Sequence, residues 1–204
     1  MHSILPAATQ ELILADLSSV GFQVASVSAL RNSGVRYGDA VPVLLSWLPR
    51  IEDPKLKGEV VRALSVPWAK PVATRPLIDQ FRSIPEDVDP TGFGLRWIIG
   101  NALDVLFDDS FFSEYVELAE DTRYGFGRQM VVLGLGKSKR PEAVGVLLSL
   151  VDDPDVDGHA IKALCKLRAP LARAAFEAKL SDQRTWVRAE ARKGLSRLAS
   201  RTTA

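Results

Sequence analysis

The sequence predicts an all-α protein in which about five helical hairpins stack in one array behind a helical cap. One apolar pattern of helical period recurs five times, and the residues between its copies form partner helices joined by short polar turns. No stretch alternates apolar and polar residues as a β-strand does. We expect one continuous domain, with the cap over residues 1–37 and the array over residues 38–204.

The recurring pattern places apolar or small residues on one face of each helix. With the first residue of a copy as position zero, positions four, seven and eight continue the stripe, a spacing that returns to the same side of an α-helix. The copies, numbered here as the first to fifth repeats, begin at Leu56, Leu95, Gly127, Val156 and Val187. Position eight is always leucine: Leu64, Leu103, Leu135, Leu164 and Leu195.

Each of these helices has an expected partner that precedes it. The partner helices are predicted over Val41–Leu48, Val72–Ser83, Phe111–Glu120, Glu142–Val151 and Leu171–Leu180. The turns Asp53-Pro54 and Asp153-Pro154 supply a carboxylate that can cap the next helix and a proline suited to its first turn. The widest spacing between copies falls at residues 83–94, which we expect to form an enlarged loop. In residues 1–37 the stretch ATQELILADLSSVG predicts one helix outside the repeat frame.

A single hairpin is too small to be stable, which explains the repetition. Ordering its backbone costs about 1 to 2 kcal/mol per residue, whereas a buried leucine contributes about 1.5 to 3 kcal/mol. Stacked hairpins share their apolar faces and build a continuous core.

The pattern D-P-x-V-x-x-x-A-x-x-A-L-x-K-L at Asp153–Leu167, followed by a proline and another helix, resembles HEAT repeats. The resemblance extends over about residues 38–201, and it implies a right-handed α-α superhelix, a HEAT-like solenoid. In the third repeat, Gly127, Gly134 and Gly136 replace the usual aliphatic or alanine residues. We interpret them as positions where helices pack closely.

In the HEAT family an arginine commonly follows position zero and ties neighbouring repeats together. Arg96, Arg128 and Arg188 match this feature, and Lys57 is a near match. The resemblance implies a structural role for these arginines. Asp157 departs from the pattern, which puts the tie between the third and fourth repeats in question.

Charge is distributed unevenly along a chain whose net charge is only +1. Residues 104–157 contain 12 acidic and 5 basic residues, a net charge of −7, whereas residues 158–204 contain 3 acidic and 11 basic residues, a net charge of +8. Such a dipole can orient a charged partner or a second copy of the chain. The alternative is chance clustering on a solvated surface.

The sequence carries few groups suited to catalysis. It contains two histidines, His2 and His159, and a single cysteine, Cys165, so no cluster has the spacing of a metal site. Gly136-Lys137-Ser138 matches the end of a phosphate-binding loop, but Val131 stands where that motif requires its first glycine. We therefore expect no catalytic residues, no metal and no cofactor. Glu11 and Asp16 interrupt the apolar start of the chain, which predicts no secretory leader and a cytoplasmic protein without membrane insertion.

The expected working surface is the concave side of the array, formed by the helices that follow the Asp-Pro turns. Side chains at positions two, three, six and ten lie off the apolar stripe, so we expect them to be exposed on this surface. We predict a noncatalytic scaffold that binds a protein or peptide partner there. Candidate contacts are Arg62, Trp97, Asn101, Gln129, His159, Lys162 and Lys193. Trp97 is either an interface anchor or a core residue between repeats, and the latter is expected of Trp47, Trp68 and Trp186. The oligomeric state is left open.

Two other functions remain open at this stage. Basic residues on or beside the last helix can follow a phosphate backbone: Arg184, Arg188, Arg192, Lys193, Arg197 and Arg201. A nucleic-acid-associated protein, or a glycosylase resembling the helical-repeat enzymes of DNA alkylation repair, would use them, with Trp97, Trp186 and Asp104 as suitable residue types for a base site. The third alternative is a HEAT-like lyase or chaperone for bilin chromophores.

Overall fold

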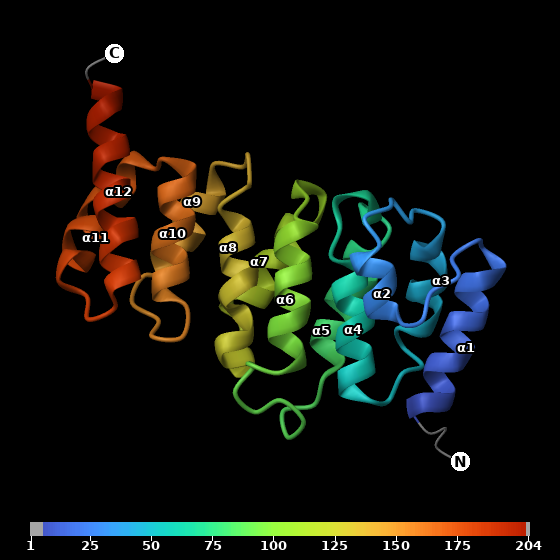
Figure 1. Ribbon diagram of the computed structural model, residues 1–204. Coiled ribbons are helices and arrows are strands. Elements are labelled where there is room, and N and C mark those ends of the chain that lie inside the picture. Colours follow the sequence, from blue (N-terminus) through green and yellow to red (C-terminus); the bar gives the residue numbers. More distant parts are fainter. Residues whose placement is uncertain (1–5, 203–204) are drawn as a thin grey trace. The chain divides into compact units, whose positions relative to one another are not determined.

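The computed structural model describes residues 6–202 of the chain, and the side chains of residues 7–200 (Figure 1). These described residues form twelve α-helices, with short 3-10 turns and no strand, so the all-α prediction is confirmed. The chain divides into two compact units. The N-terminal unit comprises Met1–Asp89 and Gly94–Leu106, and the C-terminal unit comprises Pro90–Phe93 and Phe107–Ala204.

The N-terminal unit contains the first two repeats and the cap. Its helices are α1 (Pro6–Ser19), α2 (Val27–Asn32), α3 (Ala40–Trp47), α4 (Pro54–Leu64), α5 (Thr74–Ser83) and α6 (Leu95–Val105). The hairpins α3/α4 and α5/α6 lie where the repeats predict them, and α4 packs against α6. The sequence did not predict α2. This helix packs against α4 while α1 packs against α3, so the two helices contact the first repeat as a preceding hairpin would.

Buried polar contacts join the elements of this unit. The side chain of Asp53 caps α4, as predicted, because its Oδ1 accepts a hydrogen bond of 2.7 Å from the Leu56 amide. The indole of Trp47 donates to Asp16 Oδ2 at 2.7 Å and so links α3 to α1. Trp68 packs edge-on against Tyr37 with 5.4 Å between the ring centroids. Trp47 and Trp68 thus pack inside this unit, but these contacts are with residues of the cap and not between two repeats.

The enlarged loop between α5 and α6 is held by Asp89, which is 5% exposed. Its carboxylate accepts hydrogen bonds from the Gly94 amide at 2.9 Å and from the Arg96 amide at 2.8 Å, and so caps α6 from outside the helix. The buried guanidinium of Arg96 donates to the carbonyls of Asp89 and Ile84. Arg96 thus has a structural role, as the resemblance implied, because it holds the loop that precedes α6.

The C-terminal unit contains the third, fourth and fifth repeats. Its α-helices are α7 (Phe112–Glu120), α8 (Gln129–Leu135), α9 (Glu142–Ser149), α10 (Asp157–Leu167), α11 (Arg173–Ala178) and α12 (Thr185–Thr202). The 3-10 turns are η2 (Asp109–Phe111), η3 (Thr122–Arg128), η4 (Pro170–Ala172) and η5 (Lys179–Ser181). Within each repeat the partner helix packs on its successor, and α10 packs against both α8 and α12. The apolar stripe predicted for α10 is fully buried at Val156, Ala160, Ala163 and Leu164.

The third repeat departs from the predicted pattern at its start. The helix expected from Gly127 begins two residues later, because η3 precedes it and Gly125 adopts a positive φ of 48°. The segment Pro90–Phe93 packs on this turn: the Phe126 amide donates to the Thr91 carbonyl at 3.1 Å, and the Phe93 and Phe126 rings stack with centroids 4.4 Å apart. The position of Phe126 therefore depends on a segment distant in the sequence.

Candidate functional site

Six of the seven candidate contact residues line two separate grooves, one in each unit. In the N-terminal unit, a groove of about 350 Å³ is lined by Arg31, Arg62, Ser65, Trp97, Ile98 and Asn101. In the C-terminal unit, a groove of about 590 Å³ is lined by Phe126, Gln129, Pro154, His159, Lys162, Arg184, Trp186 and Glu190. Lys193, the seventh, lies beside the second groove with its ammonium 3.6 Å from the Glu190 carboxylate. The second groove is the larger of the two.

Trp186 forms one end of the C-terminal groove. Gly158 of α10 allows its ring to approach, because a Cβ atom at Gly158 would lie 2.5 Å from the indole Cη2. The His159 ring lies 5.3 Å from the indole, and the Arg184 guanidinium lies 5.9 Å from its centroid. The predicted packing of Trp186 between repeats is thus correct, but 41% of its surface stays exposed. The indole is fixed in position and still accessible.

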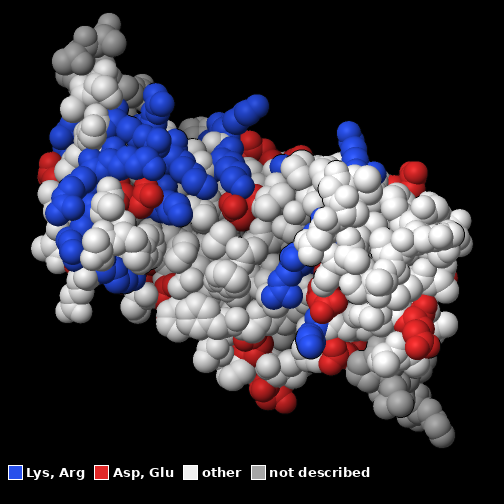
Figure 2. Space-filling view, viewed as in Figure 1, with Lys and Arg blue, Asp and Glu red and all other residues white. Residues whose placement is uncertain are grey.

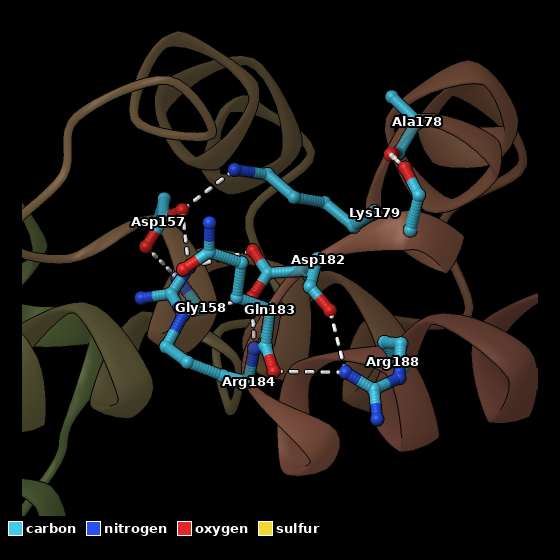
Figure 3. A network of polar contacts seen from close by, with 9 residues as sticks. Asp157, Gly158, Ala178, Lys179, Asp182, Gln183, Arg184 and Arg188 are labelled. Carbon is cyan, nitrogen blue, oxygen red and sulfur yellow. Dashed lines mark hydrogen bonds and ion pairs between the residues drawn. The ribbon is translucent and has the colours of Figure 1, made fainter.

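A network of ion pairs holds Arg184 beside this indole (Figure 3). Asp157 Oδ2 accepts hydrogen bonds of 2.6 Å from both Lys179 Nζ and Arg184 Nη2. Arg184 also bonds both carboxylate oxygens of Asp182, at 2.9 and 2.8 Å. Arg188 donates to the carbonyls of Asp182 and Gln183, at 2.6 and 2.8 Å, so it stabilises the turn of its own repeat. The fourth and fifth repeats are therefore joined through Asp157.

These contacts shift the pKa values of the carboxylates. Hydrogen bonds from Arg184 lower the pKa of Asp182 to about 2. Burial alone would raise the pKa of Asp157, but hydrogen bonds from Arg184 and Lys179 outweigh it and hold that pKa below its usual value. The network is consequently ionised at neutral pH.

The turn around Pro154, which also lines the groove, is held by Arg128, which is fully buried. Its guanidinium bonds both oxygens of Asp153, at 2.7 and 3.2 Å, and reaches Asp155 at 3.3 Å. Gln129 Nε2 donates to the Asp155 carbonyl at 2.9 Å. These bonds hold the turn that presents Pro154 to the groove.

Two expectations from the sequence are wrong at this turn. The tie between the third and fourth repeats is present, because it depends on Arg128 of the third repeat and not on the residue at position 157. Asp153 does not cap α10, whose N-cap, Val156, has no side-chain cap. The Asp153 carboxylate instead binds Arg128 and the Asp155 amide.

His159 does not have the properties of a general base near neutral pH. Burial, with smaller contributions from the Lys162 and Arg184 charges, lowers its pKa from 6.5 to about 4. The imidazole is therefore neutral at pH 7. Among the described residues, no group of three or more histidine, cysteine or acidic side chains is placed to hold a metal ion. Cys165 is buried, and burial raises its thiol pKa.

Basic side chains gather on the surface over α10 and α12 (Figure 2). Lys162 and Lys166 lie one turn apart on α10, and Lys193 and Arg197 lie one turn apart on α12. Arg197 Nη1 donates to the Cys165 carbonyl at 2.9 Å, which brings the two helices together at this point. Of the other residues considered for nucleic acid, Trp97 and Asp104 belong to the N-terminal unit and Trp186 to the C-terminal unit. The side chain of Arg201 lies outside the described residues.

Several groove residues were not among the predicted peptide contacts, although Arg184 was considered for nucleic acid. Phe126, Pro154 and Arg184 lie in turns, where helical periodicity gives no information about exposure. Glu190 does follow the periodicity, at position three of the fifth repeat. The sequence signal for Trp186 is Gly158, a glycine inside an otherwise regular helix, which marks a close contact with a neighbour.

Comparison with known proteins identifies the fold of this region. The family model of HEAT repeats matches residues 116–196, which lie within the C-terminal unit. This part of the chain consists of HEAT repeats. Every residue lining the C-terminal groove falls inside the HEAT repeats, on α8, α10, α12 and their preceding turns. No curated protein matches the chain. Within the described residues, none of the helices combines the length and apolar character needed to span a bilayer.

Proposed function

We propose that this HEAT-repeat protein is a noncatalytic scaffold that binds a peptide segment of a partner protein in the C-terminal groove. The observation that carries the proposal is Trp186, an indole held in place by Gly158, His159 and Arg184 with 41% of its surface exposed. Tryptophan and arginine contribute most of the binding energy at many protein interfaces. The groove offers both side by side.

The expected contribution of this anchor is large enough to measure. Covering the exposed part of an indole removes on the order of 80 Å² of apolar surface from water, which contributes about 2 kcal/mol. This corresponds to roughly a thirtyfold change in affinity. Because the ring is already held by its neighbours, little side-chain entropy is lost when a partner binds.

A peptide-display selection on the full-length protein tests the proposal. We expect enriched peptides to bind the protein and to lose affinity at least tenfold when Trp186→Ala removes the indole, as measured by titration calorimetry. Lys162→Glu provides a second groove variant that retains the indole. Circular dichroism and thermal melting check that both variants are folded.

Trp97→Ala is the matched control, because it removes a 36% exposed tryptophan from the N-terminal groove. Peptides that bind Trp186→Ala and Lys162→Glu as tightly as the unchanged protein would overturn the proposal. Loss of binding in Trp97→Ala alone would assign the activity to the other groove. The contacts predicted there, at Arg62, Trp97 and Asn101, stay a prediction.

A further inference from the structure

Four cations lie beside the C-terminal groove, two on α10 and two on α12. The two on each helix are one turn apart, and each pair is called a column here. Lys162 and Lys166 occupy positions six and ten of the fourth repeat, and Lys193 and Arg197 occupy the same positions of the fifth. Because α10 and α12 pack together and Arg197 reaches the Cys165 carbonyl, the columns are neighbours. Figure 2 shows a basic surface over α10 and α12, the helices that carry these columns.

The columns extend away from the apolar end of the groove. Lys193 follows Trp186 by seven residues and Arg197 follows it by eleven, which corresponds to about 10 and 16 Å along a helix. Lys166 follows His159 by seven residues, again about 10 Å. An occupant anchored on Trp186 therefore meets positive charge about 10 to 16 Å further along α10 and α12.

Carboxylates lie at the other end and in the middle, each in an ion pair. Asp155 pairs with Arg128, Asp182 pairs with Arg184, and Glu190, which lines the groove, lies within 3.6 Å of Lys193. Cations outnumber carboxylates along the two columns, at one end of this surface. A nucleic-acid strand carries negative charge along its whole length, so it would also place phosphates against the ion-paired carboxylates. A peptide can place its charges at one end only, so this distribution favours a peptide.

We propose that the C-terminal groove recognises an extended acidic peptide segment in which a large apolar side chain stands three to five residues from a pair of carboxylates. The spacing follows from the 10 to 16 Å separation, since an extended chain advances about 3.3 Å per residue. The apolar side chain packs on Trp186, and the carboxylates bind the far end of the columns, at Lys166, Lys193 and Arg197. This inference rests on the proposed function of the same groove.

Synthetic peptides labelled with fluorescein test the spacing and the charge. The reference probe carries one phenylalanine, three glycine or serine spacers and then Asp-Glu-Asp, and binding to the full-length protein is followed by fluorescence anisotropy. Replacing the acids by Asn-Gln-Asn, or the phenylalanine by glycine, is expected to weaken binding at least tenfold. Extending the spacer to nine residues is expected to weaken it severalfold. Raising the salt concentration should weaken only the acidic probes.

Charge reversal in the protein provides the reciprocal test. The double variant Lys166→Glu and Lys193→Glu changes two exposed side chains of α10 and α12. It should bind the reference probe at least tenfold more weakly and gain affinity for a probe with Lys-Lys-Lys in place of the acids. The matched control, Lys139→Glu with Arg173→Glu, reverses two exposed cations that lie outside α10 and α12 and should leave binding unchanged.

The outcomes separate this inference from the proposed function. If selected peptides depend on Trp186 but the reference probe binds the reversal variant unchanged, the acidic peptide is ruled out and the groove remains a peptide site. If no selected peptide depends on the groove, both proposals fail. If a twelve-residue oligothymidylate binds more tightly than the reference probe and loses binding in the reversal variant, the occupant is a nucleic acid and the inference is overturned.

Discussion

The C-terminal unit has two interfaces between consecutive repeats, here called joints. Each is held by an ion pair between the same two positions, but the acidic and basic residues are exchanged. At each joint, the residue after position zero of one repeat binds the residue three before position zero of the next. In the third–fourth joint Arg128 binds Asp153, and in the fourth–fifth joint Asp157 binds Arg184. A stack that skipped the fourth repeat would place Arg128 against Arg184, so the inversion of charge disfavours that arrangement.

The joints differ in burial and in what their close-packing glycines touch. The Arg128 side chain is 1% exposed and that of Arg184 is 40% exposed. At the third–fourth joint, a Cβ on Gly136 would lie 2.8 Å from the Cα of Ala163, a backbone atom that cannot move aside by itself. At the fourth–fifth joint, a Cβ on Gly158 would meet the Trp186 side chain. The third–fourth joint packs against backbone, whereas the fourth–fifth joint packs against side chains, which an added methyl group can displace more readily.

The largest expected difference between the joints follows from removing their arginines. Arg128→Met leaves Asp153 with the Asp155 amide alone and removes the guanidinium from the Ala119 carbonyl, and the loss of one member of a largely buried ion pair costs about 3 to 5 kcal/mol. Arg184→Met should cost about 1 kcal/mol or less, because solvent screens this pair and Lys179 still binds Asp157. Urea denaturation of both variants measures the free energies of unfolding. Equal losses would contradict the comparison.

Replacing the close-packing glycine of each joint by alanine should also destabilise the third–fourth joint more than the fourth–fifth joint, but by a smaller free energy than the arginine substitutions. Gly136→Ala forces α8 and α10 apart and should cost about 1 to 3 kcal/mol. Gly158→Ala should cost about 1 kcal/mol, less than Gly136→Ala, because it displaces the side chains of Trp186 and Val187 and not backbone, and because alanine favours the helix. Iodide quenching of tryptophan fluorescence should increase in Gly158→Ala and not in Gly136→Ala. A Gly158→Ala variant as unstable as Gly136→Ala would show that Trp186 is as rigid as the Ala163 backbone.

Helical periodicity was sufficient to predict the repeats because burial along a stacked helix is a local property of its sequence. The apolar stripe of α10 and the cap at Asp53 were predicted for this reason. The helix α2 was missed because its six residues are too few to show a period. The role of Asp153 was predicted wrongly because a carboxylate before a helix can cap it or bind a distant arginine, and only the fold brings Arg128 within reach.

The candidate site was predictable to the extent that it follows the same periodicity. Gln129, His159 and Lys162 lie off the apolar stripe, and the structure places them in one groove. Phe126 was not predictable, because its position depends on a stacking contact with Phe93 from a segment more than thirty residues earlier. The exposure of Trp186 depends on how α12 packs across Gly158, a contact between repeats that no single repeat encodes.

The smallest expected difference between the joints is their response to mild acid. The pKa of His159 is about 4 in the folded protein and about 6.5 in an unfolded chain, so between these values the unfolded chain binds a proton that the folded protein does not. Stability is therefore lost as the pH falls from about 6.5 towards 4, by about 1 kcal/mol at pH 5 after allowance for partial exposure.

Asp153 of the third–fourth joint has a lowered pKa, so the stability it contributes is lost only as the pH falls below about 4. Thermal melting at pH 7.5 and 5.0 should show a fall in Tm that is about 2 to 4 °C smaller in His159→Gln than in the unchanged protein. Hydrogen exchange should locate the loss in α12 and leave α8 protected. An identical fall in both proteins would mean that His159 already accepts a proton in the folded state, and the fourth–fifth joint would then share the acid resistance of its neighbour.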